Sequence, residues 1–217
     1  NRRSRGLGDV YKRQVSSCAL ALASGKDGLR LPVDLELIDN REVLAVATKR
    51  GGITAIDTKT YRVQSTTVLT GDFTSISRWK NDQGVLATDF SGHLLVSLAW
   101  TGERFEKISE LATEAYPIQV VNDVWRGRAY VANKWSRKLT DALVSADGKL
   151  GAGRKMDLPF CPREMHLFDS AGKLVVADAF GGNIAVVDVE SWRLESIRHI
   201  PGHNIRGLAS DGDGDWL

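Results

Sequence analysis

Two short polar clusters in the second half of the chain contain the residue types that bind anionic groups. Arg163 and Glu164 form the first cluster, and His203, Asn204 and Arg206 form the second. Guanidinium, imidazole and amide groups donate hydrogen bonds to carboxylates, and arginine does so through two parallel bonds. The five residues are therefore candidate binding residues for a carboxylate, a propionate or the acidic patch of a partner. The alternative is a structural role, because ion pairs between loops also tie neighbouring units together.

No catalytic or metal-binding pattern accompanies these clusters. Aspartates alternate with glycines over residues 211–215 as in a calcium loop, but Asp-Gly is also common in hairpin turns, and we predict a turn. His93, His166 and His199 lack the spacing of metal ligands. Cys161 and His166 are five residues apart in a strand-like segment, so their side chains point to opposite faces and do not form a catalytic pair. We therefore predict no catalytic residue and no metal ligand.

A repeat of 40 to 45 residues organises the segments around these clusters. Four alanines mark it at intervals of 40, 45 and 45 residues, namely Ala47, Ala87, Ala132 and Ala177. Each alanine ends a short apolar run, another β-like run begins 14 positions earlier, and turn residues lie between them. This is the pattern of a β-hairpin. The four alanines are predicted to superpose in the second strand of each repeat, where neighbouring repeats approach closely.

A third strand and a fourth strand complete the repeat. Glycine-containing turns follow most of the alanines, and the Asp57-x-x-x-Tyr61-Arg62 segment of the first repeat matches Asp188-x-x-x-Trp192-Arg193 of the last. Four antiparallel strands at this period form one blade of a β-propeller. Helical repeats would need longer runs with i, i+3, i+4 apolar spacing, and a β-sandwich would lack the fixed repeat.

The predicted fold is all-β, a partial β-propeller of about four four-stranded antiparallel blades within residues 32–217. The blades are expected at about 32–71, 72–116, 117–161 and 162–202, with the start of a fifth at 203–217. The loops that enter the inner strands of a propeller gather around its central channel, which is where both polar clusters should lie. Five tryptophans near strand ends are predicted to pack between blades, namely Trp79, Trp100, Trp125, Trp135 and Trp192.

The beginning of the chain is predicted to lie outside this fold. Residues 1–14 resemble a translated sequencing adapter, as expected of a metagenomic fragment, and residues 15–31 resemble the end of a secretory signal peptide followed by a linker. A strand from an earlier blade is the alternative for the second segment. The formal charge of +2 becomes −2 without the five basic residues and one acidic residue of 1–14. This removes the electrostatic argument for nucleic-acid binding, and no apolar run is long enough for a transmembrane helix.

The residues Ala129-Tyr130-Val131-Ala132-Asn133 resemble the repeat motif of the bacterial Tyr-Val-Thr-Asn (YVTN) family of β-propellers. Residues 32–37 and 173–188 are similar to other parts of that repeat, so the likeness covers about 32–217. It implies the fold and leaves the activity open, because propellers host many functions.

A narrower resemblance concerns residues 158–164 and 200–208. They are similar to secreted bacterial proteins, common in planctomycetes, in which a propeller precedes a di-haem cytochrome c peroxidase-like domain. This implies an extracytoplasmic protein, periplasmic or at the cell surface, with a haem domain as its partner in the same chain. The chain contains no Cys-x-x-Cys-His motif. No cofactor is therefore predicted within it, and the haem would belong to a domain beyond Leu217.

Two functions follow from these observations. The first is a non-catalytic, extracytoplasmic scaffold or binding module, the propeller half of a c-type cytochrome or peroxidase-like electron-transfer protein. The second is a lactonase-like or lyase-like propeller enzyme with its site in the central channel, for which Glu164, His203, Asn204 and Arg206 are the candidate residues. A row of blades that does not close exposes sheet edges, so self-association through those edges is also expected.

Overall fold

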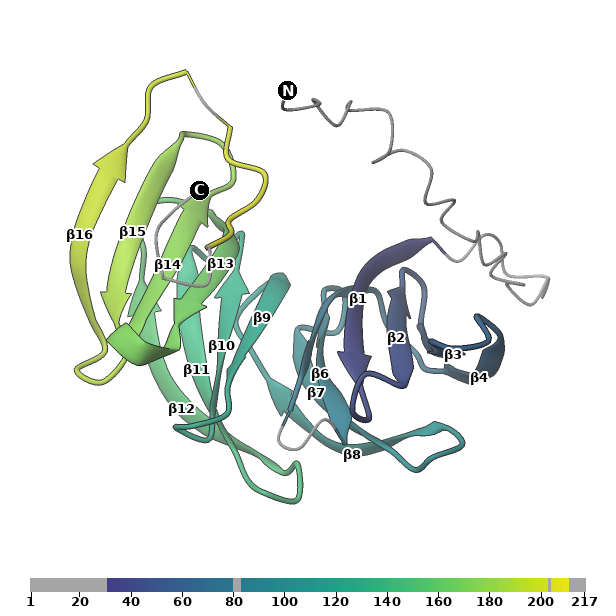
Figure 1. The fold of residues 1–217 in the computed structure, drawn as a ribbon. Coiled ribbons are helices and arrows are strands. Elements are labelled where there is room, and N and C mark those ends of the chain that lie inside the picture. The colour runs from purple at the N-terminus through teal and green to yellow at the C-terminus, as the bar shows by residue number, and fades with distance from the viewer. Residues whose placement is uncertain (1–30, 80–82, 203, 211–217) are drawn as a thin grey trace, which may run out of the picture.

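The computed structural model describes residues 31–79, 83–202 and 204–210, which form four antiparallel sheets of four strands each (Figure 1). Blade 1 comprises β1 (Pro32–Ile38), β2 (Val43–Thr48), β3 (Gly52–Asp57) and β4 (Val63–Val68), and blade 2 comprises β5 (Phe73–Arg78), β6 (Gly84–Asp89), β7 (Leu94–Trp100) and β8 (Phe105–Ala112). Blade 3 comprises β9 (Pro117–Asp123), β10 (Arg128–Asn133), β11 (Lys138–Val144) and β12 (Leu150–Asp157), and blade 4 comprises β13 (Pro162–Phe168), β14 (Lys173–Asp178), β15 (Asn183–Asp188) and β16 (Arg193–His199). The predictions for residues 1–14, for most of 15–31 and for 211–217 concern parts of the chain outside the described residues.

The predicted all-β architecture of four four-stranded blades is confirmed, and the local sequence explains it. The second strand of blade 2, β6, is buried along its whole length because blades 1 and 3 cover its two faces. The fourth strand β4 alternates half-buried and exposed residues, as expected where one face meets solvent. The turn into β3 needs Gly51, whose φ is 79° and whose Cβ would lie 1.8 Å from the Leu69 carbonyl oxygen. Within the described residues, no helix has the length and apolarity to cross a membrane.

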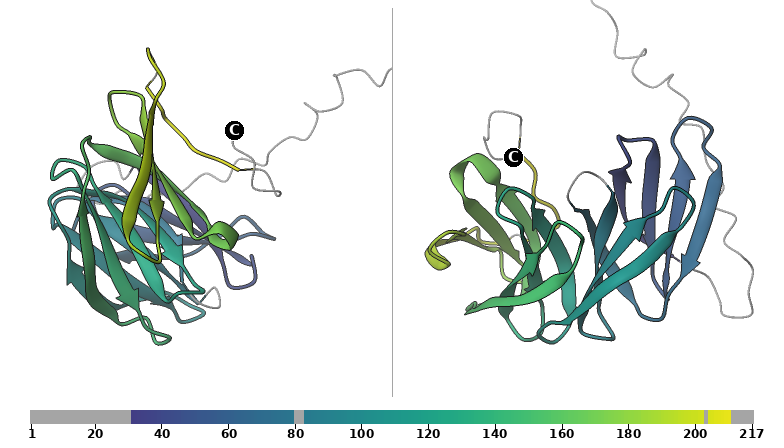
Figure 2. Two further views of the ribbon diagram at one scale, coloured as in Figure 1. Left: turned by 90° about the vertical axis from the view of Figure 1, so that its left-hand side faces the viewer. Right: turned by 90° about the horizontal axis from the view of Figure 1, so that it is seen from below.

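The four blades follow one another along an arc with their first strands inside (Figures 1 and 2). These inner strands lie side by side in the order β1, β5, β9 and β13. They all run in the same direction, so the molecule has an entry face where they begin and an exit face where they end. The turns 49–51, 90–93, 134–137 and 179–182 lie on the entry face. Three clusters of buried apolar side chains fill the junctions between consecutive blades.

The register corrects one of the four predicted alanine positions. Ala47, Ala132 and Ala177 each precede the last residue of their strand, whereas Ala87 precedes it by two and Thr88 takes the equivalent place. Side chains alternate along a strand, so Ala87 faces blade 1 instead of blade 3. Strand β6 is buried throughout, so its residue pattern did not distinguish the two faces.

The tryptophan prediction is only partly correct. Trp79 and Trp192 pack at junctions between blades, and Trp100 packs against the cluster between blades 1 and 2. In contrast, Trp125 is 85% exposed in a turn of the exit face, and Trp135 is 54% exposed in a turn of the entry face. Recurrence near strand ends therefore does not distinguish a packed indole from one at the tip of a turn.

Candidate functional site

The entry face opens into a cavity of about 570 Å³ where the four inner strands begin. Asp34 of β1, Ser75 of β5, Gln119 of β9 and Glu164 of β13 line it, one residue from each blade. The four positions are equivalent, because each follows the irregularity in pairing near the start of its inner strand. We call this cavity the channel mouth.

Three of these four side chains hold the next blade in place. Each accepts a hydrogen bond from a backbone N–H of the following inner strand, which would otherwise lack a partner on that side. The bonds join Asp34 Oδ2 to Ile76 N at 2.8 Å, Ser75 Oγ to Val120 N at 3.5 Å, and Gln119 Oε1 to Met165 N. In blades 1 to 3 the side chain at this position therefore has a structural role, because it joins its own blade to the next one.

Glu164 occupies the same position in blade 4 and has different partners. Its Oε2 accepts a hydrogen bond from Gln119 Nε2 at 3.2 Å, and its Oε1 lies 3.6 Å from Arg163 Nε. Burial raises the pKa of the Glu164 carboxyl above its usual range, Arg163 opposes this shift, and the charge of Asp34 adds to it. The channel mouth therefore contains a half-buried carboxylate that a single arginine offsets in part.

The structure places the predicted binding residues in two groups. Arg163 and Glu164 line the channel mouth from the start of β13. Asn204 and Arg206 are exposed in a segment that returns toward β13, where Ser210 Oγ lies 2.8 Å from His166 Nε2. Among the described residues, no hydrogen bond or ion pair joins Asn204 or Arg206 to the channel mouth. His203 lies outside the described residues.

A basic and aromatic rim borders the channel mouth and was not predicted. The Trp135 ring lines the cavity and lies 5.8 Å from the Phe180 ring, which is 57% exposed. Lys134 Nζ lies 5.0 Å from the Trp135 ring centroid and 4.7 Å from that of Phe180. A cation above an aromatic face is attracted by the ring quadrupole, so this geometry holds the lysine at the rim.

The sequence does contain a signal for this rim. Phe90, Trp135 and Phe180 are spaced by 45 residues, the interval of the repeat itself. All three lie in the turns between second and third strands on the entry face. A periodic aromatic in a turn, as opposed to a strand, indicates a surface feature that successive blades share.

The exit face is organised by paired charges. Asp123 is fully buried and accepts hydrogen bonds from Arg126 Nη1 at 3.1 Å and Tyr130 Oη at 3.0 Å. Arg126 Nε also binds Glu190 Oε1 of blade 4 at 2.5 Å. Burial, with a contribution from Asp123, raises the pKa of the Tyr130 hydroxyl, so this group remains a donor. The network joins blades 3 and 4.

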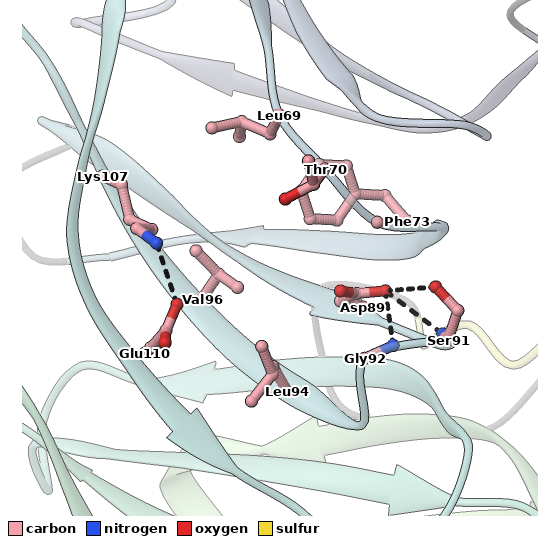
Figure 3. A pocket seen from close by; sticks show the side chains of 11 residues that line it. Leu69, Thr70, Phe73, Asp89, Ser91, Gly92, Leu94, Val96, Lys107 and Glu110 are labelled. Atoms are coloured by element: carbon pink, nitrogen blue, oxygen red, sulfur yellow. Dashed lines mark hydrogen bonds and ion pairs between the residues drawn. The ribbon is translucent and has the colours of Figure 1, made fainter.

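A hollow of about 370 Å³ between blades 1 and 2 carries no site of its own (Figure 3). Its polar centre is the buried Asp89, whose Oδ1 accepts hydrogen bonds from three backbone N–H groups at 2.9–3.1 Å. Lys107 and Glu110, which also line it, pair with each other at 2.9 Å. The charged groups of the hollow are therefore already engaged within the fold.

Across the described ranges, no group of three His, Cys, Asp or Glu side chains could hold a metal ion.

Solved structures with similar folds are β-propellers of low sequence identity. The chain is similar to hydrazine synthase of Kuenenia stuttgartiensis, with a TM-score of 0.76 and 15% identity over 90% of this chain and 56% of that one. It is similar to a functionally unknown protein of Desulfotomaculum acetoxidans, with a TM-score of 0.74 and 14% identity over 84% of this chain and 60% of that one. A putative 6-phosphogluconolactonase of Bacteroides uniformis matches with a TM-score of 0.71 and 15% identity over 84% and 61%.

These comparisons define the chain as a β-propeller protein and go no further. No family model and no curated protein matches the sequence. The chain spans 56% to 61% of the length of the three structures named above. Because one propeller fold hosts unrelated functions, the function must be argued from the site.

Proposed function

We propose that this protein is a non-catalytic binding module of the YVTN type whose partner docks at the channel mouth. The observation that carries this proposal is the solvent-exposed pair Trp135 and Phe180 beside a cavity with one polar group from each blade. Exposed aromatic side chains next to converging polar groups are typical of binding surfaces. The partner in this proposal is a c-type cytochrome or peroxidase-like domain, and the protein works outside the cytoplasm as an electron-transfer scaffold.

In this proposal the haem belongs entirely to the partner. The chain lacks a Cys-x-x-Cys-His motif, and the imidazole of His166 is already engaged with Ser210. The residues that line the channel mouth include no histidine, cysteine or methionine, so they do not fit the role of haem-iron ligands. Arg163 and Lys134 instead fit contacts with a carboxylate or propionate at the surface of the partner domain.

The proposal is tested with a purified di-haem cytochrome c peroxidase-type domain. The full chain should co-elute with that domain in size-exclusion chromatography, followed by haem absorbance. Arg163→Ala should weaken the complex by about tenfold, since a truncated charge contact commonly costs that much. Arg62→Ala on the exit face is the control and should leave the complex unchanged. No complex with the unaltered chain would refute the partner, and a complex insensitive to Arg163→Ala would place docking elsewhere.

A hydrolytic function is the second candidate, because one observation favours it. Ser210 Oγ lies 2.8 Å from His166 Nε2, a hydroxyl beside a base. Burial and the charge of Asp123 raise the pKa of the Asp169 carboxyl, and Arg126 and His166 oppose this shift. Hydrolysis of a lactone or an activated ester by the full chain, abolished by Ser210→Ala, would establish this function. If the full chain does not raise the hydrolysis rate above that of the uncatalysed reaction, a hydrolytic function is excluded for those substrates.

A further inference from the structure

Two turns of the entry face carry four cationic side chains that have no acidic partner among the described residues. Lys49 and Arg50 lie in the turn 49–51, and Lys134 and Arg137 lie in the turn 134–137. No carboxylate among the described residues forms an ion pair with any of these four side chains. Lys49, Arg50 and Arg137 are exposed, and Lys134 is held over the Trp135 and Phe180 rings.

The acidic residues of the same face are mostly engaged within the fold. Asp89 and Asp178 bind the turns that follow them, and Asp178 accepts hydrogen bonds from Phe180 N at 3.0 Å and Asn183 Nδ2 at 2.6 Å. Glu114 pairs with Lys155 at 2.6 Å, and the exposed Asp157 lies 3.9 Å from Lys138. Asp72 remains as a half-buried carboxylate without an ion pair among the described residues. The outer part of the entry face is therefore positive, although the chain beyond residue 14 is slightly acidic.

We propose that this surface binds an acidic segment of a protein partner. The surface, which we call the entry-face crown, consists of Lys49, Arg50, Lys134, Trp135, Arg137 and Phe180. Carboxylates of the segment would meet the two basic turns, and an apolar side chain would pack on the exposed Trp135 and Phe180 rings. The location rests on the proposed function, and the inference adds the chemistry of the partner.

The carboxylates of the channel mouth favour a protein segment over a nucleic acid. Asp34 and Glu164 line the channel mouth together with Lys134, and the Glu164 carboxylate is only partly offset by Arg163. A continuous phosphate backbone that crossed the mouth would pass over both carboxylates and be repelled. A peptide can instead place uncharged or hydrogen-bond-donating groups there and its acids over the crown.

The test measures the anisotropy of a short fluorescein-labelled poly-glutamate peptide with a central tryptophan, in the presence of the full chain. Binding should weaken as salt is added, because exposed charges are screened. Lys134→Glu with Arg137→Glu should weaken binding by about tenfold or more, through repulsion in place of attraction. The control, Arg62→Glu with Arg193→Glu, makes the same charge change at two equivalent exposed positions of the exit face and should alter binding by less than about twofold. Thermal melts show whether each variant folds, and Lys134→Gln with Arg137→Gln replaces the charge reversal if it does not.

Three results would overturn the inference. These are no peptide binding by the unaltered chain, equal losses in the two charge-reversed variants, or tighter crown-dependent binding of single-stranded DNA of equal charge. If the peptide does not bind but the haem domain still binds in an Arg163-dependent manner, only the proposal that the crown binds an acidic segment is refuted. If the peptide binds and the haem domain does not, only the partner proposed above is refuted.

Discussion

The network around Arg126 on the exit face and the turn 134–137 on the entry face use charged residues in opposite ways. On the exit face Arg126 bridges the buried Asp123 and Glu190, so its charge joins two blades. On the entry face Lys134 and Arg137 have no acidic partner among the described residues, and exposed aromatic rings lie beside them. Paired charge here stabilises the fold, and unpaired charge next to aromatic side chains is available for binding. The following predictions test this distinction, from the largest expected effect to the smallest.

Removal of the central acid of the exit face should have the largest effect on stability. Asp123→Ala leaves the Tyr130 hydroxyl, which is fully buried, without its acceptor and leaves Arg126 with Glu190 alone. We expect a loss of about 2–4 kcal/mol in the free energy of unfolding, measured by urea denaturation. If Asp123→Ala lowers the free energy of unfolding by less than Lys134→Glu with Arg137→Glu does, the paired charges of the exit face do not contribute more to stability than the unpaired charges of the entry face.

Near the entry face, the junction of blades 3 and 4 should depend on close apolar packing. Ala132 is fully buried at the junction of blades 3 and 4, and a larger side chain there would overpack it. Ala132→Phe should therefore lower the free energy of unfolding by about 1–3 kcal/mol and reduce the melting temperature. Ala112→Phe, at the exposed end of β8, is the control and should change it little. An unchanged melting temperature for Ala132→Phe would mean that the junction of blades 3 and 4 can accommodate the larger side chain.

The two exposed tryptophans provide a matched test of binding. Trp135 lines the channel mouth, and Trp125 is more exposed but lies on the exit face. Trp135→Ala should weaken binding of the acidic peptide by about 1–2 kcal/mol, because an aromatic anchor is lost. Trp125→Ala should leave that binding unchanged. Neither substitution should shift the melting temperature by more than a few degrees, since both rings are largely in solvent. Equal losses of binding would argue against a docking site on the entry face.

The smallest expected effect concerns the charge of Glu164. Because burial raises its pKa in the folded state, the neutral form favours folding, and this contribution is lost as the pH rises through the folded pKa. Glu164→Gln should therefore raise the melting temperature by about 1–2 °C at neutral pH. In acid, where the carboxyl is protonated in both folded and unfolded states, the variant should match the original chain. A lower melting temperature at neutral pH would show that Arg163 outweighs burial.

The blade architecture could be predicted from the sequence because its causes are local. Alternating and continuous apolar runs of four to eight residues define the strands, and glycine-containing turns separate them. The recurrence of this pattern at 40 to 45 residues was enough to predict four four-stranded sheets. It also indicated that Arg163 and Glu164 lie where an inner strand begins.

The candidate site could be predicted only in part, because its remaining features depend on contacts between blades. Gln119 reaches both the Met165 N–H and Glu164 across a full repeat, which no pattern within one blade reveals. The face to which Ala87 points depends on the register of β6, since that strand is buried on both faces.

The sequence by itself determined the repeat, the strands and the residue types at the entry loops, since these follow from backbone periodicity and turn chemistry. Only the tertiary structure decided that Trp135 is exposed whereas Trp79 is buried, because exposure depends on whether a neighbouring blade covers the ring. It also decided that Asp123 is paired and that Lys134 has no acidic partner among the described residues. The pairing of Arg126 with Glu190 of the next blade, 64 residues later, depends on the tertiary fold, and it distinguishes this stabilising network from the turn proposed to bind.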